Sequence, residues 1–173
     1  MEHVLEVIQQ RYSVRAYKDR PVEEEKLTRV LEAARLAPSA KNRQEWRFIV
    51  VRDSQKRQAL AQAARDQHFV GEAPVILVCC AVTNHHMMTC GQYCYPIDVA
   101  IAMEHIALQA VAEGLGTCWI GAFYEYPVKK LLHIPDPVRV VELMPLGYPA
   151  DDPLPKDRLP LEHIVMQEEW RED

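Results

Sequence analysis

Apolar side chains recur along the first third of the chain at the spacing of amphipathic helices. Residues 2–10 carry them at helical intervals and predict a first helix that runs into an arginine-containing segment. A second helix is predicted after Pro21, where three glutamates match the positive end of a helix dipole, and Pro38 ends it. Asp53 and Ser54 can cap a third helix that continues to Arg65.

Other segments have the pattern of strands. Residues 46–51 are rich in β-branched and aromatic side chains and predict a strand. Residues 74–82 are apolar throughout, which predicts a central strand that is covered on both faces. Residues 117–122 and 138–146 predict two further strands. In the sequence between the central strand and residue 117, residues 97–113 are apolar around most of a helix circumference. They predict a buried helix that Gly114 ends.

The remaining segments complete the expected fold. Residues 83–95 have no periodicity and predict an irregular excursion, while closely spaced prolines after Tyr148 predict an extended C-terminal arm. The apolar residues 161–166 of this arm need a surface to pack on. Helices and strands interleave, but short connections leave room for antiparallel pairs. The pattern therefore predicts an α+β fold in three layers, a mixed central β-sheet flanked by helices, with residues 1–173 forming a single domain.

Composition restricts the classes of function. A formal net charge of −5 argues against nonspecific nucleic-acid binding, which needs a surplus of Lys and Arg facing the phosphates. The longest apolar run, residues 74–82, is much shorter than the roughly 20 residues of a membrane-spanning helix, so no membrane association is predicted. The N-terminus lacks the features of a secretory signal, and five cysteines fit free thiols in a reducing compartment. We therefore expect a cytoplasmic protein.

One short segment carries candidate binding chemistry. Arg11, Ser13 and Arg15 alternate along the chain, so in an extended conformation their side chains project to one side. Two guanidinium groups and a hydroxyl together suit a phosphate, because the arginine fork donates two parallel hydrogen bonds and stays charged. Taken alone, the pattern also fits a solvated helix end with salt bridges to the glutamates near Glu23.

Four segments together identify a family. The chain reads Arg-Tyr-Ser-Val-Arg at 11–15, Pro-Ser-Ala-Lys-Asn-Arg-Gln-Glu-Trp at 38–46, Gly-Leu-Gly-Thr-Cys-Trp-Ile-Gly at 114–121 and Leu-Gly-Tyr-Pro at 146–149. In this order they resemble the signature segments of the FMN-dependent nitroreductase superfamily, over nearly the whole chain. The resemblance implies the nitroreductase-like version of the predicted fold. Neither the glycine-rich fingerprint of a dinucleotide-binding domain nor a P-loop is present.

The resemblance also implies roles for individual residues. Arg11 and Ser13 would bind the phosphate and ribityl end of FMN, and Lys156 and Arg158 of the arm would complete that cradle. Arg15 would lie near N1 of the ring and stabilise the negative charge of the reduced flavin. At Gly121 and Ala122 the backbone would approach the ring and donate a hydrogen bond to N5. The further candidates for cofactor or pocket contacts are Tyr12 and Tyr124, for which an ordinary structural tyrosine is the alternative.

A second subunit is part of the implied site. The family builds two shared active sites across a homodimer, so Pro38, Ser39 and Asn42 would reach the flavin of the partner subunit, with Gln44 as a further polar candidate. Trp46 is expected in the core. One departure is visible at Glu45, where the family commonly has proline, and the conformation of this turn is therefore open.

The predicted function is that of an FMN oxidoreductase. NADH or NADPH would deliver hydride to flavin N5, and a small-molecule electron acceptor such as a nitroaromatic, a quinone or an activated alkene would then be reduced in the same cavity by ping-pong kinetics. The alternatives within the superfamily are a reductive dehalogenase and an enzyme that consumes its flavin. A non-catalytic flavin redox sensor or storage protein is the alternative from another class.

The irregular excursion contains potential metal ligands at His85, His86, Cys90 and Cys94. Their spacing differs from that of structural zinc sites, so we predict no metal site, and a zinc-binding interaction module remains the weakest alternative. From its place before the buried helix, the excursion is expected to cover the open face of the flavin and to shape the substrate pocket.

Overall fold

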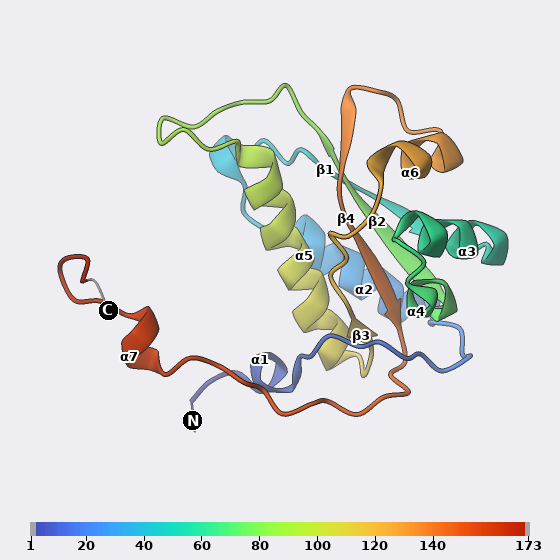
Figure 1. Cartoon of the computed structure of the whole chain (residues 1–173), viewed down its shortest axis with the longest axis horizontal. Helices are drawn as coiled ribbons and strands as arrows, with labels where there is room; N and C mark the ends of the chain where they lie inside the picture. Colours follow the sequence, from blue (N-terminus) through green and yellow to red (C-terminus); the bar gives the residue numbers. More distant parts are fainter. Residues whose placement is uncertain (1–2, 172–173) are drawn as a thin grey trace.

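The computed structural model describes residues 3–171, and within this range the strands form one antiparallel sheet in the order β1–β2–β4–β3 (Figure 1). The strands β1 (Trp46–Val51) and β4 (Val138–Gly147) flank the central β2 (Val75–Val82). The two-residue β3 (Gly116–Thr117) pairs with the end of β4. All the ladders are antiparallel, and the parallel component expected of a mixed sheet is reduced to one bridge between Ser13 and Thr117.

The central strand β2 contributes to two cores. Val75, Leu77 and Cys79 pack into the core on one face of the sheet, whereas Ile76 and Val78 pack into the core on the other face. Each of these side chains is at most 1 % exposed. Because successive strand residues point to opposite faces, this alternation explains why the whole segment is apolar, and it confirms the predicted central strand.

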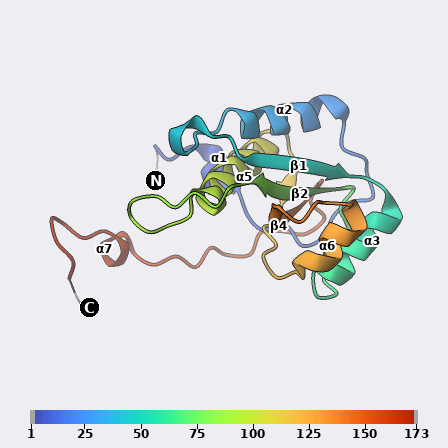
Figure 2. The same ribbon diagram turned by 90° about the horizontal axis from the view of Figure 1, so that it is seen from above.

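The helices form a layer on each face of the sheet (Figure 2). On one face lie α2 (Glu24–Arg35) and α5 (Cys94–Ala112), and their buried residues join the core that contains Leu77. On the other face lie α3 (Ser54–Ala63), α4 (His68–Glu72) and α6 (Glu125–Leu132), whose apolar residues pack with Ile76. The three-layer α+β arrangement is therefore confirmed.

Helix α5 is the long buried helix predicted from its apolar circumference. Met103 and Ile106 are fully buried, and the helix starts at Cys94, three residues before the predicted start. Pro96 lies in its first turn, where the missing N–H of a proline breaks no helical hydrogen bond. The cap predicted for α3 is also present, because the side chain of Asp53 accepts a hydrogen bond from the amide of Lys56 at 2.9 Å.

The strand predicted over residues 117–122 is interrupted. Thr117 pairs with Leu146 and Ile120 with Leu143, so both contacts keep the same register along β4. Between them, that register sets Pro145 opposite Cys118, and proline has no N–H to donate to the ladder. The prediction was wrong for residues 118–119, where the neighbouring strand causes the break, and also for residues 121–122, which are not in a strand.

The short helices α4 and α6 were not predicted, and the first helix is shorter than expected. The described part of the predicted segment 2–10 contains α1 (Glu6–Gln10), and residue 2 lies outside the described residues. The predicted arm is extended and leaves the body after Pro149, with one turn of helix, α7 (Leu161–Ile164), near its end (Figure 1). Among the described residues, no helix has the length and apolar character that crossing a bilayer requires.

Candidate functional site

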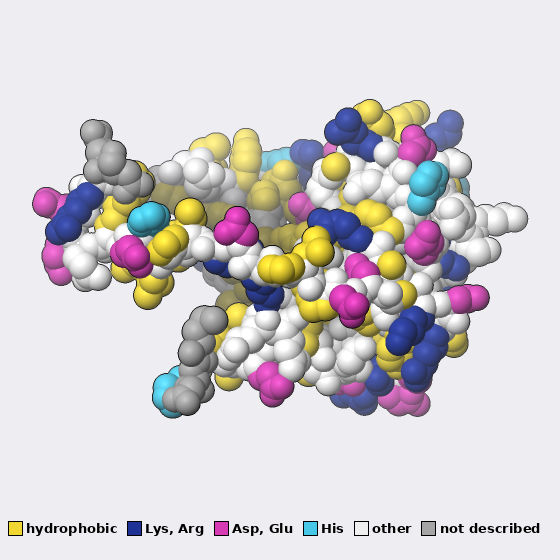
Figure 3. Space-filling model, turned by 60° about the horizontal axis from the view of Figure 1, so that its bottom comes forward, with side chains coloured by type: hydrophobic (Ala, Val, Ile, Leu, Met, Phe, Trp, Pro, Cys, Tyr) yellow, Lys and Arg dark blue, Asp and Glu magenta, His cyan; other side chains and the backbone are white. Residues whose placement is uncertain are grey.

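A cavity of about 460 Å³ lies between the segment 11–15 and the first part of the C-terminal arm. It brings together the cationic residues that the sequence pointed to, and its wall consists of Arg11, Tyr12, Ser13, Arg15, Asp151, Asp152, Leu154, Pro155, Lys156 and Arg158. Although these residues come from opposite ends of the chain, they face one space. The arm itself extends clear of the body beyond this cavity (Figure 3).

Pairing with the sheet holds the segment 11–15 in place. The amide of Val14 donates to the carbonyl oxygen of Thr117 at 3.0 Å, and the Val14 side chain is fully buried. A Cβ atom at Gly116 would lie 2.3 Å from Val14 Cγ2, so only glycine allows the segment to approach β3 this closely. Burial of Val14 leaves its neighbours Ser13 and Arg15 to face the cavity.

Asp151 joins this segment to the start of the arm, and the sequence analysis had not identified it. One of its carboxylate oxygens accepts a hydrogen bond from the amide of Arg15 at 2.7 Å. The hydroxyl of Tyr12 donates to the carbonyl oxygen of Asp151 at 2.8 Å, and burial together with the nearby Asp151 carboxylate raises the pKa of Tyr12 to about 12. The local sequence pattern gave no sign of these contacts, because Asp151 is 136 residues from Arg15 and 139 residues from Tyr12.

The cations of the cavity form no ion pairs among the described residues, although Asp151 and Asp152 belong to the same wall. Within residues 3–171, no ion pair involves Arg11, Arg15, Lys156 or Arg158; Arg15 and Arg158 donate to nearby carbonyl oxygens, and Lys156 donates to the carbonyl of Gln9. Burial, together with repulsion from Arg11 and Arg158, lowers the pKa of Lys156. Four cations that face one cavity and are not held in ion pairs can donate to an anionic ligand with several charges.

Gly121 and Ala122 lie beyond the interrupted strand, in the connection that leads to α6. Among the described residues, neither of their amides has a hydrogen-bond acceptor, so both can donate to a ligand. A Cβ atom at Gly121 would lie 3.1 Å from an Oε atom of Glu142. The Glu142 carboxyl has one buried oxygen without a partner among the described residues, and burial raises its pKa. Glu142 was not among the residues identified from the sequence; it lies in β4, a strand that is mostly apolar but also contains Arg139.

Pro38, Ser39, Asn42 and Gln44 belong to a segment that lies beside the first turns of α5 (Figure 1). None of these residues lines the cationic cavity of the same chain. The segment is held by its own contacts, since Ser39 Oγ accepts from the amide of Gln44 at 3.0 Å and the Gln44 side chain donates to Asn42. Its role at a partner's site stays a prediction.

The potential ligands of the irregular excursion do not assemble. The ring of His85 contacts the rings of Tyr93 and Tyr95 edge-on, with centroids 5.9 and 5.7 Å away. Cys90 is exposed, whereas Cys94 is buried at the start of α5. Within residues 3–171, the potential ligands that do come together are Glu45, Cys94 and Asp98. Trp46, next to Glu45, is in the core as predicted.

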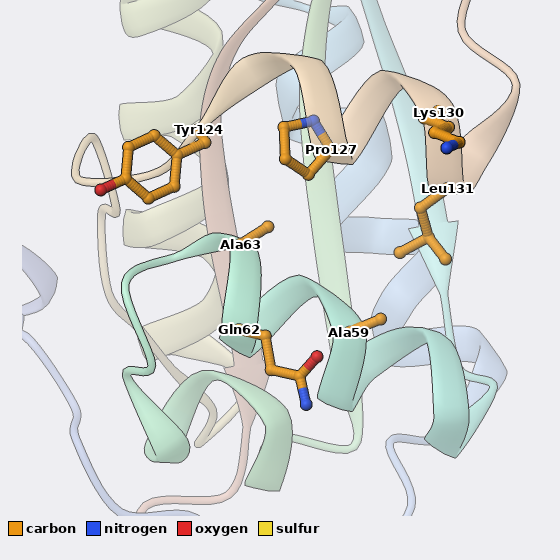
Figure 4. A pocket seen from close by; sticks show the side chains of 7 residues that line it. All are labelled: Ala59, Gln62, Ala63, Tyr124, Pro127, Lys130 and Leu131. Atoms are coloured by element: carbon orange, nitrogen blue, oxygen red, sulfur yellow. The ribbon is translucent and has the colours of Figure 1, made fainter.

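A second cavity, of about 660 Å³, lies between α3 and α6 (Figure 4). Its wall is mostly apolar, with Lys130 as the one cation, and consists of Ala59, Gln62, Ala63, Tyr124, Pro127, Lys130 and Leu131. Tyr124, a candidate pocket residue from the sequence, therefore lines this cavity and not the cationic one. A wall of this kind does not fit a dianionic phosphate, so the smaller cationic cavity is the better candidate for the binding site.

Comparisons with known proteins place the chain in a family. Residues 8–148 match the model of the Nitroreductase family. A nitroreductase family protein from Clostridium novyi NT is 40% identical, with a TM-score of 0.80 over 84% of both chains. The FMN-dependent nitroreductase of Clostridium difficile R20291 is 30% identical, with a TM-score of 0.83 over 95% of this chain and 98% of its own. The FMN reductase [NAD(P)H] of Bacillus subtilis strain 168 is 30% identical over 98% of this chain and 75% of its own length.

Proposed function

Because the chain belongs to the nitroreductase family, we propose that it uses FMN to transfer hydride from NADH or NADPH to a small organic acceptor. The family makes it an NAD(P)H-dependent flavin oxidoreductase. The proposal adds the identity of the flavin, the order of the two substrates and the acceptor classes, which are nitroaromatics, quinones and activated alkenes. The observation that carries it is the convergence of Arg11, Arg15, Lys156 and Arg158 on one cavity, where none of them forms an ion pair within residues 3–171.

The phosphate end of FMN fits the cationic cavity. Arg11, Lys156 and Arg158 would neutralise a dianionic phosphate, and Ser13 would add a hydroxyl donor. The lowered pKa of Lys156 supports this role, because an anion among these cations would relieve their repulsion. Asp151 is compatible with it, since its carboxylate already accepts from the Arg15 amide and leaves the guanidinium groups unpaired.

The ring would lie between Arg15 and the connection to α6. When bound, FMN would supply a ring that accepts hydride at N5 and gives it to a second substrate after the nicotinamide has left. Arg15 would stabilise the negative charge at N1, and the unpaired amides of Gly121 and Ala122 would donate toward N5. No nucleophilic side chain is needed, so discrimination among acceptors would follow the shape of the open pocket.

A homodimer would complete each site. Pro38, Ser39, Asn42 and Gln44 would come from the partner subunit, which fits their distance from the cationic cavity of their own chain. The C-terminal arm supports this proposal, because Leu161, Ile164 and Trp170 are 61 to 79 % exposed in the single chain. Apolar side chains of this size are normally covered, and a second copy of the chain offers the missing surface.

Substitution of Arg15 tests the cofactor part of the proposal. Arg15→Ala is expected to raise the dissociation constant of FMN at least about tenfold, because a charge-assisted contact is lost, and to slow flavin reduction by NAD(P)H. Fluorescence titration with FMN and anaerobic stopped-flow absorbance measure the two effects. Arg35→Ala is the control, since Arg35 is exposed and pairs with Glu32 on α2. Wild-type affinity and rate in Arg15→Ala would remove Arg15 from the site.

Turnover separates this function from its alternatives. Sustained NAD(P)H oxidation with a nitroaromatic or quinone, and with the flavin intact afterwards, is the expected result. Loss of flavin during turnover would indicate a flavin-consuming enzyme, and halide release from a halogenated aromatic in preference to the other acceptors would indicate a dehalogenase. A bound flavin that is readily reduced but passes electrons to none of these acceptors would favour a redox sensor.

A further inference from the structure

Three potential metal ligands meet where β1 begins beside the first turns of α5. Glu45 immediately precedes β1, and Cys94 and Asp98 belong to α5. The residues are 7, 0 and 3 % exposed, respectively. Polar groups of this kind are rarely buried together without a function or a shared partner. The cluster lies outside the cationic cavity and outside the cavity between α3 and α6.

The geometry suits a single ion. Cys94 and Asp98 are four residues apart, so the helix presents both side chains on one face. One potential ligand atom from each of the three residues lies within 4.8 Å of the other two, and Cys94 Sγ is 3.5 Å from a carboxylate oxygen of Glu45. Ligand atoms around tetrahedral zinc are about 3.3 to 3.8 Å apart, so small rotations of the side chains would close the site.

One oxygen of the Asp98 carboxylate has no hydrogen-bond partner among the described residues. Its Oδ1 accepts a hydrogen bond from the amide of Ala40 at 3.0 Å. Its Oδ2 is buried and has no partner among residues 3–171. Buried carboxylate oxygens are almost always satisfied, and the free oxygen belongs to a carboxyl group that already faces Cys94 and Glu45. This unpaired atom points to a missing ligand that accepts lone pairs, as a cation does.

We propose that Glu45, Cys94 and Asp98 bind a divalent metal ion of borderline softness, with Zn²⁺ as the best match. One thiolate and two carboxylates are zinc ligands, and a fourth position would be left for water. Arg43 is close enough to interact electrostatically with Cys94 and Asp98, and its Nε is buried without a hydrogen-bond partner among the described residues. The charges of Zn²⁺ and Arg43 together would balance the three negative ligands.

The bound metal would have a structural role. It would join the start of β1 to α5, and through the Ala40–Asp98 hydrogen bond it would fix the neighbouring segment 38–44. This site does not depend on bound FMN. The two proposals can therefore fail separately.

Cobalt titration of the purified full-length protein tests the site, because Co²⁺ occupies zinc sites and reports thiolate ligation in its absorption spectrum. Difference spectra are recorded against metal-free protein with the same flavin content. They should show a thiolate-to-Co²⁺ charge-transfer band that saturates at one equivalent of Co²⁺. Addition of one equivalent of Zn²⁺ should abolish this band. Cys94→Ser is expected to lose the band. Asp98→Asn and Glu45→Gln are expected to weaken Co²⁺ binding at least tenfold, which also keeps the test open if Cys94→Ser does not fold.

Cys90→Ser is the matched control, because Cys90 is the exposed cysteine of the same excursion and is not part of the cluster. It should retain the band and the affinity of the wild type. Failure of the wild-type protein to bind Co²⁺ or Zn²⁺ would overturn the proposal. A band that disappears in Cys90→Ser but persists in Cys94→Ser would overturn it as well, since the metal would then be held by the exposed part of the excursion.

Discussion

At the scale of the residue, small features decide how the candidate site is assembled. Gly116 lets the segment that carries Ser13 pack against β3, since a side chain there would meet the buried Val14. Pro145 of β4 interrupts the ladder between β4 and residues 116–120, because it has no N–H to donate to Cys118. Neither effect was visible in the local sequence pattern, because each depends on a residue from a distant part of the chain.

Gly116→Ala is expected to destabilise the protein by about 1 to 3 kcal/mol and to weaken FMN binding. The new Cβ would lie 2.3 Å from Val14 Cγ2, and a fully buried, β-branched valine has little freedom to move away. Urea unfolding followed by circular dichroism measures the change in the free energy of unfolding. In the control Gly71→Ala, the new Cβ would meet the flexible end of Gln58, so a smaller loss is expected. Equal losses would contradict this explanation.

The same scale shows what the sequence could predict of the site. Arg11, Ser13, Arg15, Lys156 and Arg158 were found because their order along the chain resembles a known family, and the structure brings them to one cavity. Asp151 was missed because an acidic residue was not expected beside a cationic site. The Glu45, Cys94 and Asp98 cluster was missed as well, because Glu45 is far from the other two residues in sequence and only the packing of α5 beside the start of β1 brings the three together.

At the scale of the element, long periodic segments were predicted well and short ones were not. The patterns of α2, α5, β1, β2 and β4 were long enough to identify the buried face. The helix α4 has 5 residues and α6 has 8, so their apolar positions are too few to establish a period. The residue at which an element ends also depends on tertiary contacts. The end of α5 is an example, because Glu113, which follows it, is bound to α2.

Glu113 connects the end of α5 to α2. Arg29 donates to both of its carboxylate oxygens at 2.7 Å and lowers the pKa of Glu113 to about 2. Because the folded state holds this carboxylate ionised, its contribution to stability is present above the unfolded pKa of about 4.5 and is lost as pH falls through about 2. Glu113→Gln is therefore expected to cost about 1 kcal/mol at neutral pH.

The measurement is urea unfolding of both proteins between neutral and strongly acidic pH. The difference in the free energy of unfolding should shrink toward zero as pH approaches 2. A difference that stays constant over this range would show that the loss comes from packing and not from the ionised carboxylate.

At the scale of the whole molecule, the arm is the part that the single chain does not explain. It leaves the three-layer body and carries exposed apolar side chains along its length (Figure 3). The prolines of the sequence predicted its extended conformation, whereas the surface that covers it cannot be found within residues 3–171. The proposed homodimer would account for the arm and for the distance between the segment 38–44 and the cationic cavity.

Leu161→Asp combined with Ile164→Asp is expected to shift the protein from dimer to monomer, because two charges would have to be buried against the partner subunit. The two residues are 68 and 61 % exposed in the single chain, so the folded monomer itself should tolerate the change. Sedimentation velocity gives the oligomeric state. Tyr126→Asp, at an exposed aromatic residue of α6, is the control. A wild-type monomer, or a variant that remains fully dimeric, would contradict the proposed role of the arm.

The most direct measurement of the central claim is an anaerobic titration of the purified protein with NADH and NADPH while the flavin absorbance is followed. We expect one FMN per chain, bleaching of its visible bands by either or both donors, and recovery of the bands when a nitroaromatic or a quinone is added. A colourless protein that does not take up added FMN would contradict it.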